Sequence, residues 1–240
     1  MIKNQYQKFN KNYLKKSKKI VIKDYFKGTI RIIKKKYSIK SPVSLIDMGC
    51  ASGFFLEYFG SIYKNSKLSG LDFSSQLIKV AKKENPDMNF FVKNLLKKQK
   101  NNIGKFDITT CLGTLHAFDN LEIPIKNLFN VSKKKGLIVI FTLVNSYDVN
   151  VISRYQKNYG NDKSWYTAFN NFSKPYWIEK IKKVNPRCKV KFHDFNLKNK
   201  LKKSKDPMRS WTETFGKNKK QLTVGTSQIL NYKLIEIINY

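Results

Sequence analysis

Features that mark several common classes of protein are missing from this chain of 240 residues. Its three cysteines, Cys50, Cys111 and Cys188, are scattered and form no C-x-x-C pair, so we expect reduced thiols and no metal site. No apolar run reaches the ~18 residues that a membrane helix needs. The basic segment 1–20 lacks the apolar core of a signal peptide. We therefore expect a cytoplasmic protein without a transmembrane segment.

The chain also lacks the short motifs of several enzyme classes. It contains no Gly-x-Ser-x-Gly nucleophile elbow, no Gly-Lys-Ser/Thr phosphate loop and no His-Glu-x-x-His zinc motif. The sequence therefore gives no support to a serine hydrolase, a nucleotide hydrolase of the phosphate-loop type or a zinc protease.

Arginine is scarce although the chain is strongly basic. The net charge is +32, and only four of the 48 basic residues are Arg, namely Arg31, Arg154, Arg187 and Arg209. A charge of this size can attract nucleic acid or an acidic membrane surface. Lysine binds phosphate in a bidentate manner less well than arginine does. The chain is also rich in Asn, Ile, Tyr and Phe, and an AT-rich genome encodes this composition together with many lysines. We expect the charge to reflect composition and no nucleic-acid partner, and an anionic partner is the alternative.

Apolar runs alternate with helical patterns through the first 142 residues. We expect strands near 43–48, 67–72, 88–92, 106–112 and 137–142, and helices over 54–63, 75–85 and 120–132. This alternation predicts a parallel sheet with helices on both of its faces. Apolar residues at helical spacing within the N-terminal segment 1–40 predict an amphipathic helix over 20–37 that packs on the sheet.

The stretch that organises the chain joins the first strand to the first core helix. An apolar run from Val43 ends at an acidic residue, and a loop of small residues follows, which lets the backbone lie close to a ligand. Written as Asp47-x-Gly49-x-Ala51-x-Gly53, this stretch resembles the first motif of class I S-adenosylmethionine-dependent methyltransferases. Alanine replaces the middle glycine of that motif, and a positive φ at Ala51 would cost about 1 kcal/mol.

The resemblance extends to the ends of the next strands. Asp72 lies 19 residues after Gly53, where the resemblance implies an acid that binds the ribose hydroxyls, and Phe73 would stack near the adenine. The alternative for Asp72 is a helix N-cap, although Ser74 could do that equally well. The family often has an Asp in the place of Asn94, beside Leu95, that accepts from the adenine amino group. Asn94 could do so through its oxygen or could simply form a turn.

Residues 106–116 resemble the fourth motif of the same family. The resemblance implies that Leu112 packs on the adenine and that His116 faces the methyl group. His116 is then a candidate catalytic base, since its free pKa lies near neutrality, and Asp119 could orient it. The alternative is a structural histidine in a turn. The Asn/Asp-Pro-Pro-Tyr/Phe motif of nucleic-acid methyltransferases is absent here, which disfavours methylation of bases.

The remaining residues are less regular. Residues 144–171 are polar and aromatic, and they form either a cover for the substrate or an ordinary helical connection. We expect a helix over 173–184, a strand over 188–197, a hairpin of 211–215 with 221–224 and a last strand over 232–238. Since no repeat or linker is visible, we expect one domain over 1–240, with an N-terminal helical segment 1–40, a cofactor-binding core 43–142 and a substrate-covering part 143–240.

The resemblance, which covers residues 43–142, carries expectations about fold and function. It implies an α/β fold with a doubly wound, mostly parallel Rossmann-like sheet, helices on both faces and an antiparallel last strand. It implies methyl transfer from S-adenosyl-L-methionine to an oxygen atom of a small-molecule, sugar or lipid-linked acceptor. It also implies that residues 1–19 form a lid over the cofactor. The alternative function is a non-catalytic basic binding protein that retains this fold. The sequence determines neither the acceptor nor the oligomeric state.

Overall fold

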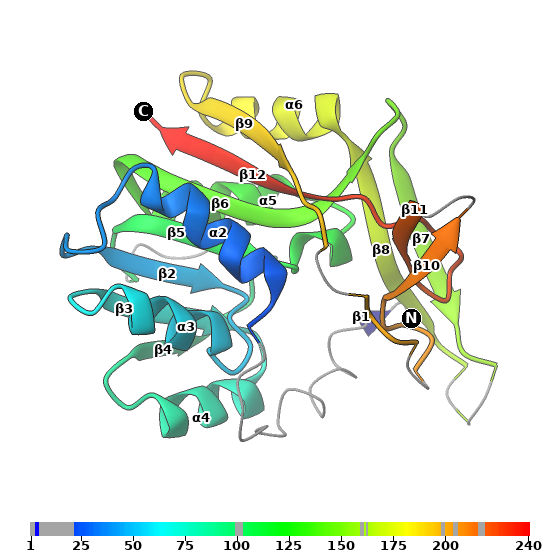
Figure 1. The fold of residues 1–240 in the computed structure, drawn as a ribbon, viewed down its shortest axis with the longest axis horizontal. Helices are drawn as coiled ribbons and strands as arrows, with labels where there is room; N and C mark the ends of the chain where they lie inside the picture. The colour runs from blue at the N-terminus through cyan, green and yellow to red at the C-terminus, as the bar shows by residue number, and fades with distance from the viewer. Residues whose placement is uncertain are drawn as a thin grey trace.

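The computed structural model describes residues 3–4, 22–98, 103–158, 161, 163–197, 200–203, 206–215 and 219–240. A twisted central sheet crosses the molecule, and a group of accessory strands lies at one end of it (Figure 1). None of the helices within these residues is long and apolar enough to cross a membrane.

The main sheet runs in the order β4-β3-β2-β5-β6-β12-β9. Its parallel strands are β2 (Ser44–Met48), β3 (Lys67–Asp72), β4 (Asn89–Val92), β5 (Phe106–Leu112) and β6 (Ser132–Asn145). The last strand, β12 (Tyr232–Asn239), runs antiparallel to both β6 and β9 (Lys189–Asp194). The central strand β6 is buried from Gly136 to Val144, as expected for a strand covered on both faces. The predicted doubly wound sheet with an antiparallel last strand is confirmed.

Helices cover both faces of this sheet. One apolar cluster joins it to α2 (Asp24–Lys34), α3 (Phe54–Ile62) and α4 (Ser75–Glu84). A second cluster joins the opposite face to the short helix η1 (Leu115–Ala117), α5 (Glu122–Val131) and α6 (Lys174–Val184). The helices α2 and α3 lie in front of the sheet in Figure 1. The amphipathic helix expected over 20–37 is present as α2, whose buried residues include Phe26, Ile30 and Ile33.

The N-terminal segment is not helical throughout. Residues Lys3–Asn4 form the short strand β1, which pairs in parallel with the accessory strand β8 (Trp165–Ser173). The other residues of the lid expected over 1–19 lie outside the described residues. The expectation of a continuous helical segment over 1–40 was therefore wrong at β1.

The segment 144–171 is built from strands. β7 (Val151–Gln156) pairs antiparallel with β8, and the end of β8 pairs with the end of β6 through Val144 and Phe172. A second hairpin, predicted from the sequence, joins β10 (Trp211–Phe215) to β11 (Lys219–Thr223). A separate apolar cluster, which includes Leu143, Phe169 and Met208, fills the space beneath these strands. An ordinary helical connection, the alternative for this segment, is excluded.

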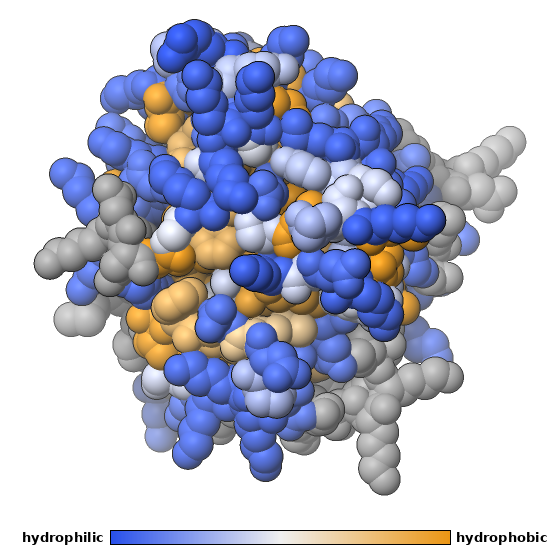
Figure 2. All heavy atoms as spheres, turned by 90° about the vertical axis from the view of Figure 1, so that its left-hand side faces the viewer, coloured by the Kyte–Doolittle hydropathy of each residue, from blue (hydrophilic) through white to orange (hydrophobic). Residues whose placement is uncertain are grey.

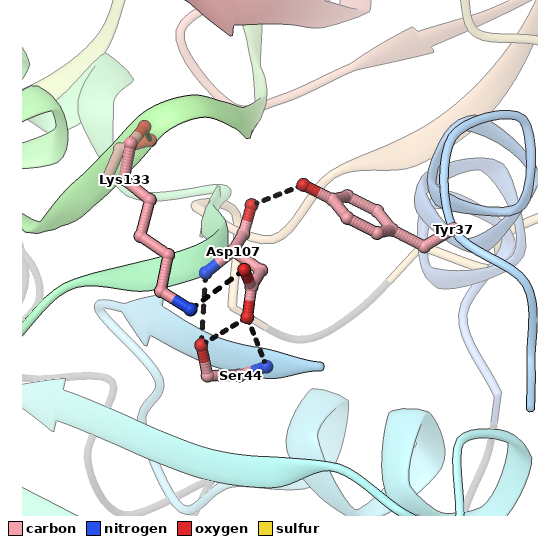
Figure 3. A network of polar contacts seen from close by, with 5 residues as sticks. Tyr37, Ser44, Asp107 and Lys133 are labelled. Carbon is pink, nitrogen blue, oxygen red and sulfur yellow. Dashed lines mark hydrogen bonds and ion pairs between the residues drawn. The ribbon is translucent and has the colours of Figure 1, made fainter. Parts of the chain in front are cut away.

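The amino ends of the parallel strands are held by a polar network (Figure 3). The Asp107 carboxylate accepts from the Ser44 backbone N–H at 2.9 Å, from Ser44 Oγ at 2.6 Å and from Lys133 Nζ at 2.9 Å, while Tyr37 donates to the Asp107 carbonyl at 3.0 Å. Burial alone would raise the pKa of Asp107, but the hydrogen bonds from Ser44 and Lys133 hold this pKa below its usual value. Figure 2 views the molecule from this side and shows a mainly hydrophilic face crossed by an apolar band.

Candidate functional site

A pocket of about 170 Å³ lies at the carboxyl ends of the parallel strands. The strand β2 stands between β3 and β5, so the order of the sheet reverses at this point. Open α/β sheets bind ligands in the crevice that such a reversal leaves between strand ends. The lining residues come from the loop after β2, the ends of β3 and β4, the turn after β5 and the start of α2.

The loop after β2 approaches the pocket with its backbone. Gly49 has a φ of +93°, and a Cβ at this residue would lie 2.4 Å from Thr114 Oγ1, so a side chain is excluded on both conformational and steric grounds. Its backbone N–H donates to the Leu71 carbonyl at 2.7 Å. Ala51, which replaces the family's middle glycine, has a φ of +49° and donates its backbone N–H to Asp72 Oδ2 at 3.0 Å. The loop is thereby tied to the end of β3.

Gly53 does not line the pocket, unlike the other residues predicted in this loop. It is the N-cap residue of α3, and its backbone N–H donates to the Cys50 carbonyl at 2.9 Å. The chain has left the strand ends where α3 begins, and a contact of Gly53 with the cofactor stays a prediction.

Two buried carboxylates, Asp47 and Asp72, line the pocket. Asp47 is 3% exposed, and its Oδ1 accepts from Thr110 Oγ1 at 2.7 Å. Burial raises the pKa of Asp47 to about 7, against the hydrogen bond from Thr110, and the charge of Asp72 adds to the rise.

Asp72 is held by two backbone donors. Its Oδ1 accepts from the Ser74 N–H at 2.9 Å, and its Oδ2 accepts from Ala51. Burial raises the pKa of Asp72 despite these bonds. Ser74 is the N-cap of α4, since its Oγ accepts from the Leu77 N–H at 3.3 Å. The carboxylate of Asp72 therefore points to the loop after β2 and to the pocket.

An apolar wall faces these carboxylates. Phe73, Leu95 and Leu112 all line the pocket, and Phe73 is 38% exposed. Asn94 lines it as well, but its side-chain oxygen accepts from the Leu96 N–H at 2.9 Å. This bond corresponds to the turn role that the sequence left open for Asn94.

His116 is not among the residues that line the pocket. It is 5% exposed in η1, its ring stacks on Phe169 of β8 at 5.3 Å, and Tyr232 meets it edge-on at 5.8 Å. Burial lowers the pKa of His116 to about 4. The carboxylate of Asp119 is bonded to Arg154 at 2.5 Å and to Asn170 at 2.9 Å. The segment 144–171 therefore packs over the η1 turn. The ring of His116 faces this segment through its contact with Phe169.

Sequence reasoning missed several residues of the pocket. Lys23 and Tyr25 line it from the start of α2, and Thr114 lines it from the turn after β5. The helical periodicity predicted α2, but periodicity does not show which end of a helix lies beside the carboxyl ends of the strands and so lines the pocket. Tyr25 also stacks on Phe141 of β6 at 4.5 Å, a contact that depends on the tertiary fold alone.

Comparison with known proteins places the chain in a family. Residues 39–212 match the family model described as "Methyltransferase domain". Among curated proteins, the chain is 28% identical over 140 residues to protein 235L of Invertebrate iridescent virus 6, a candidate methyltransferase, and the match covers 58% of this chain and 50% of that protein. It is 23% identical over 110 residues to malonyl-[acyl-carrier protein] O-methyltransferase of Bacillus anthracis, with 45% and 40% covered. The chain thus matches half or less of the length of these relatives.

Solved structures share the fold along almost the whole chain. An S-adenosylmethionine-dependent methyltransferase from Clostridium acetobutylicum aligns with a TM-score of 0.58 at 12% identity, covering 98% of this chain and 99% of that one. Magnesium protoporphyrin IX methyltransferase from Synechocystis, solved with its methyl donor bound, aligns with a TM-score of 0.58 at 9% identity and covers 99% and 93%. Because the family match covers residues 39–212, from just before β2 to the start of β10, the chain belongs to the methyltransferase-domain family.

Proposed function

We propose that this protein transfers a methyl group from S-adenosylmethionine to an oxygen atom of a small-molecule acceptor. The observation that carries the proposal is the pair Asp47 and Asp72 at the ends of β2 and β3, beside a loop in which only glycine fits at residue 49. These features surround a pocket at the reversal point of the sheet, where this architecture binds nucleotide ligands.

The residues present fit the adenine and the ribose of the methyl donor. Phe73, Leu95 and Leu112 supply an apolar wall for the adenine. Asp72 supplies a charged acceptor for the ribose hydroxyls, because a carboxylate has acceptor sites beyond the two that Ala51 and Ser74 use. A Cβ built at Gly113 meets nothing within 4 Å, so the backbone there leaves room for a ligand.

The donor supplies a methyl group that is already activated by a positive sulfur, so the protein has mainly to bind, orient and exclude water. The backbone of the loop after β2 and the carboxylate of Asp72 fix the donor against the strand ends. Tyr25 and Phe26 of α2 close the pocket from the side, which reduces the access of water. No residue of this chain needs to form a covalent bond with the methyl group.

Oxygen as the acceptor atom is supported by the names of three relatives, each a malonyl-[acyl-carrier protein] O-methyltransferase. An acceptor hydroxyl or carboxylic acid must lose its proton. We do not assign that step to His116, since it lies outside the pocket and its pKa is lowered to about 4. We infer instead that His116 is a turn residue that packs η1 against β8 and β12.

We infer also that the accessory strands belong to the same domain, since β6 and β12 pass from the main sheet into their apolar cluster.

Calorimetric titration of the full chain with S-adenosylmethionine and with S-adenosylhomocysteine tests the proposal. We expect both to bind, and we expect Asp72→Asn to weaken both by roughly 10- to 100-fold, because a hydrogen bond to a charged group contributes about 1.5–3 kcal/mol. Asp87→Asn, an exposed change of equal charge in the loop after α4, is the matched control and should bind as the native chain does. Unchanged affinity in a folded Asp72→Asn protein would refute the role of Asp72, and absence of any binding would refute the function.

A further inference from the structure

A base is needed at the pocket if the acceptor oxygen belongs to a hydroxyl group. A carboxylic acid is already ionised at about pH 7, whereas a phenol or an alcohol keeps its proton there. The described residues that line the pocket include six titratable side chains, which are Lys23, Tyr25, Asp47, Cys50, Asp72 and Lys93. A side chain that takes the proton of a hydroxyl acceptor is expected in this set.

Five of the six are poorly suited to this step. The ammonium groups of the two lysines are donors without an acceptor site. Burial raises the pKa of the Cys50 thiol well above its usual value, so the thiol stays neutral. Asp47 and Asp72 lie at the ends of β2 and β3, where the Thr110 hydroxyl and two backbone N–H groups donate to their oxygens. Both carboxylates are thus on the side of the pocket that we assign to the donor.

Tyr25 lies on the other side of the pocket, above the end of β6. Its ring stacks on Phe141 at 4.5 Å with 7° between the planes, and Phe141 pairs in register with Leu112 at the end of β5. The adenine wall proposed above comes from the ends of β3 and β5 and from the loop after β4, so the methyl group of a donor bound there would point along the strand ends toward β6. An acceptor must approach that methyl group from the side opposite to the sulfur, and Tyr25 is next to this approach.

Lys23 provides a cation at the hydroxyl of Tyr25. Its Nζ donates to the Tyr25 hydroxyl oxygen at 3.0 Å, and both residues line the pocket. An ammonium at hydrogen-bond distance favours the ionised form of a phenol, and such charge-assisted bonds are strong. Lys27, one turn further along α2, pairs with Asp24 instead. The start of α2 therefore brings a tyrosine hydroxyl and a stabilising cation to the pocket together.

We propose that Tyr25, assisted by Lys23, is the general base that removes the proton of a hydroxyl-bearing acceptor, a phenol or an alcohol. The inference rests on the function proposed above. The phenolate oxygen of Tyr25 takes the hydroxyl proton, the acceptor oxygen bonds to the methyl carbon, and the electron pair of the carbon–sulfur bond stays on sulfur. The positive charge of the donor and the negative charge of the phenolate disappear together. Tyr25 then returns its proton to solvent, beside the partly exposed Lys23.

Other charged groups act on the ionisation of Tyr25 in both directions. The carboxylates of Asp47 and Asp72 in the same pocket oppose the phenolate, whereas Lys93 and the positive sulfur of the bound donor favour it. The elements packed against this part of α2 are β6, β12 and α3. They present aromatic rings, which belong to Phe141, Tyr232, Phe55 and Tyr58. Lys23 is thus the cation in direct contact with the Tyr25 hydroxyl among the described residues.

The first test follows the ionisation of Tyr25 with no acceptor present. The full chain, isotope-labelled at the ζ carbon of tyrosine and saturated with S-adenosylhomocysteine, is titrated with base and followed by NMR. The Tyr25 signal is the one that Tyr25→Phe lacks. Lys23→Met should raise the midpoint of this signal by about one pH unit, because the phenolate loses its cation. Lys27→Met, an equal change of charge on the same helix, should leave the midpoint nearly unchanged.

The second test measures methyl transfer from radiolabelled S-adenosylmethionine to a panel of simple phenols, alcohols and carboxylic acids. Members with a hydroxyl group should be methylated. Tyr25→Phe, which keeps a ring against Phe141, should lower kcat by roughly 100-fold without weakening the binding of S-adenosylhomocysteine. The native rate should rise with pH up to the Tyr25 midpoint, and Lys23→Met should move this rise to higher pH.

The outcomes separate this inference from the function on which it rests. A Tyr25 midpoint that Lys23→Met leaves in place, a pH profile of the rate that survives Tyr25→Phe, or methylation of carboxylic acids alone would each overturn the inference while the function stands. Failure of S-adenosylmethionine and S-adenosylhomocysteine to bind would overturn the function itself. The titration decides the matter if no member of the panel is methylated, and the rate profile of Lys23→Met decides it if Tyr25→Phe does not fold.

Discussion

Ala51 holds a backbone conformation that favours glycine. Its φ of +49° places an L-residue in the left-handed region, which costs about 1 kcal/mol or more. We expect Ala51→Gly to raise the free energy of unfolding by roughly 0.5–1 kcal/mol, because the relief of strain exceeds the added freedom of the unfolded chain. Ala81→Gly, inside α4 at a fully buried residue, should lower it by about 1 kcal/mol. Denaturant unfolding of both variants measures the two effects, and a destabilised Ala51→Gly protein would contradict this account.

His116 should make stability depend on pH in the acid range. Its folded pKa is lowered by burial from 6.5 to about 4. The stability that its neutral form contributes is therefore fully present above about pH 6.5 and is lost as the pH falls toward 4, by about 3 kcal/mol at most. Asp47 acts with the opposite sign, because its folded pKa is raised from 3.8 to about 7, and the stability that its neutral form contributes is lost as the pH rises from about 4 to about 7.

The comparison of His116→Phe with the native chain isolates this effect. Phenylalanine keeps a ring against Phe169 and Tyr232 but cannot take a proton. We expect the variant to lose less stability than the native chain between about pH 6.5 and about pH 4, as measured by urea unfolding at each pH. Parallel loss in both proteins would show that His116 is not the titrating group.

At the scale of elements, the hairpin β7–β8 is joined to the η1–α5 connection by polar contacts. Arg154 and the fully buried Asn170 both bond to the carboxylate of Asp119, and Asn170 also accepts from the Ser153 backbone N–H at 3.0 Å. Arg154→Met should speed amide exchange over 151–156 and 165–173 by several-fold, because the hairpin loses its charged contact with the η1–α5 connection. Affinity for S-adenosylhomocysteine should change little, since the pocket lies elsewhere.

Lys180→Met provides the control for this prediction. Lys180 pairs with Glu179 on the exposed side of α6, and such pairs contribute little to stability. Its exchange pattern should therefore match that of the native chain. Equal protection of the hairpin in the Arg154→Met protein would show that the apolar cluster around Phe169 and Leu143 holds it without Asp119.

The elements that the sequence predicts well are those whose pattern is local. The parallel strands and the helices α4, α5 and α6 are readable from apolar periodicity and from caps such as Ser74 and Ser173. The hairpin β7–β8 is not, because its aromatic residues pack against η1 and the accessory strands, which are distant in sequence. The same limit applies to the site. Asp72 and Gly49 were predicted through the resemblance to a family's motifs, whereas the contacts of His116 with Phe169 and Tyr232 arise only in the folded chain.

At the scale of the whole molecule, the net charge of +32 calls for a direct test. We propose that the charge reflects composition, and that generic duplex or single-stranded nucleic acid therefore binds weakly. Such binding should vanish at roughly 0.2 M salt, because it depends on counterion release alone. Fluorescence titrations with two unrelated sequences at low and moderate salt measure it. Tight binding that survives that salt and distinguishes the sequences would overturn the proposal.

The measurement that tests the central claim most directly is a crystal structure of the full chain with S-adenosylhomocysteine. The account predicts the ligand at the carboxyl ends of β2, β3 and β5, with its ribose hydroxyls on Asp72, its adenine against Phe73 and Leu112, and its sulfur nearer Asp47 than His116. A ligand bound elsewhere, or a ribose that does not contact Asp72, would contradict it.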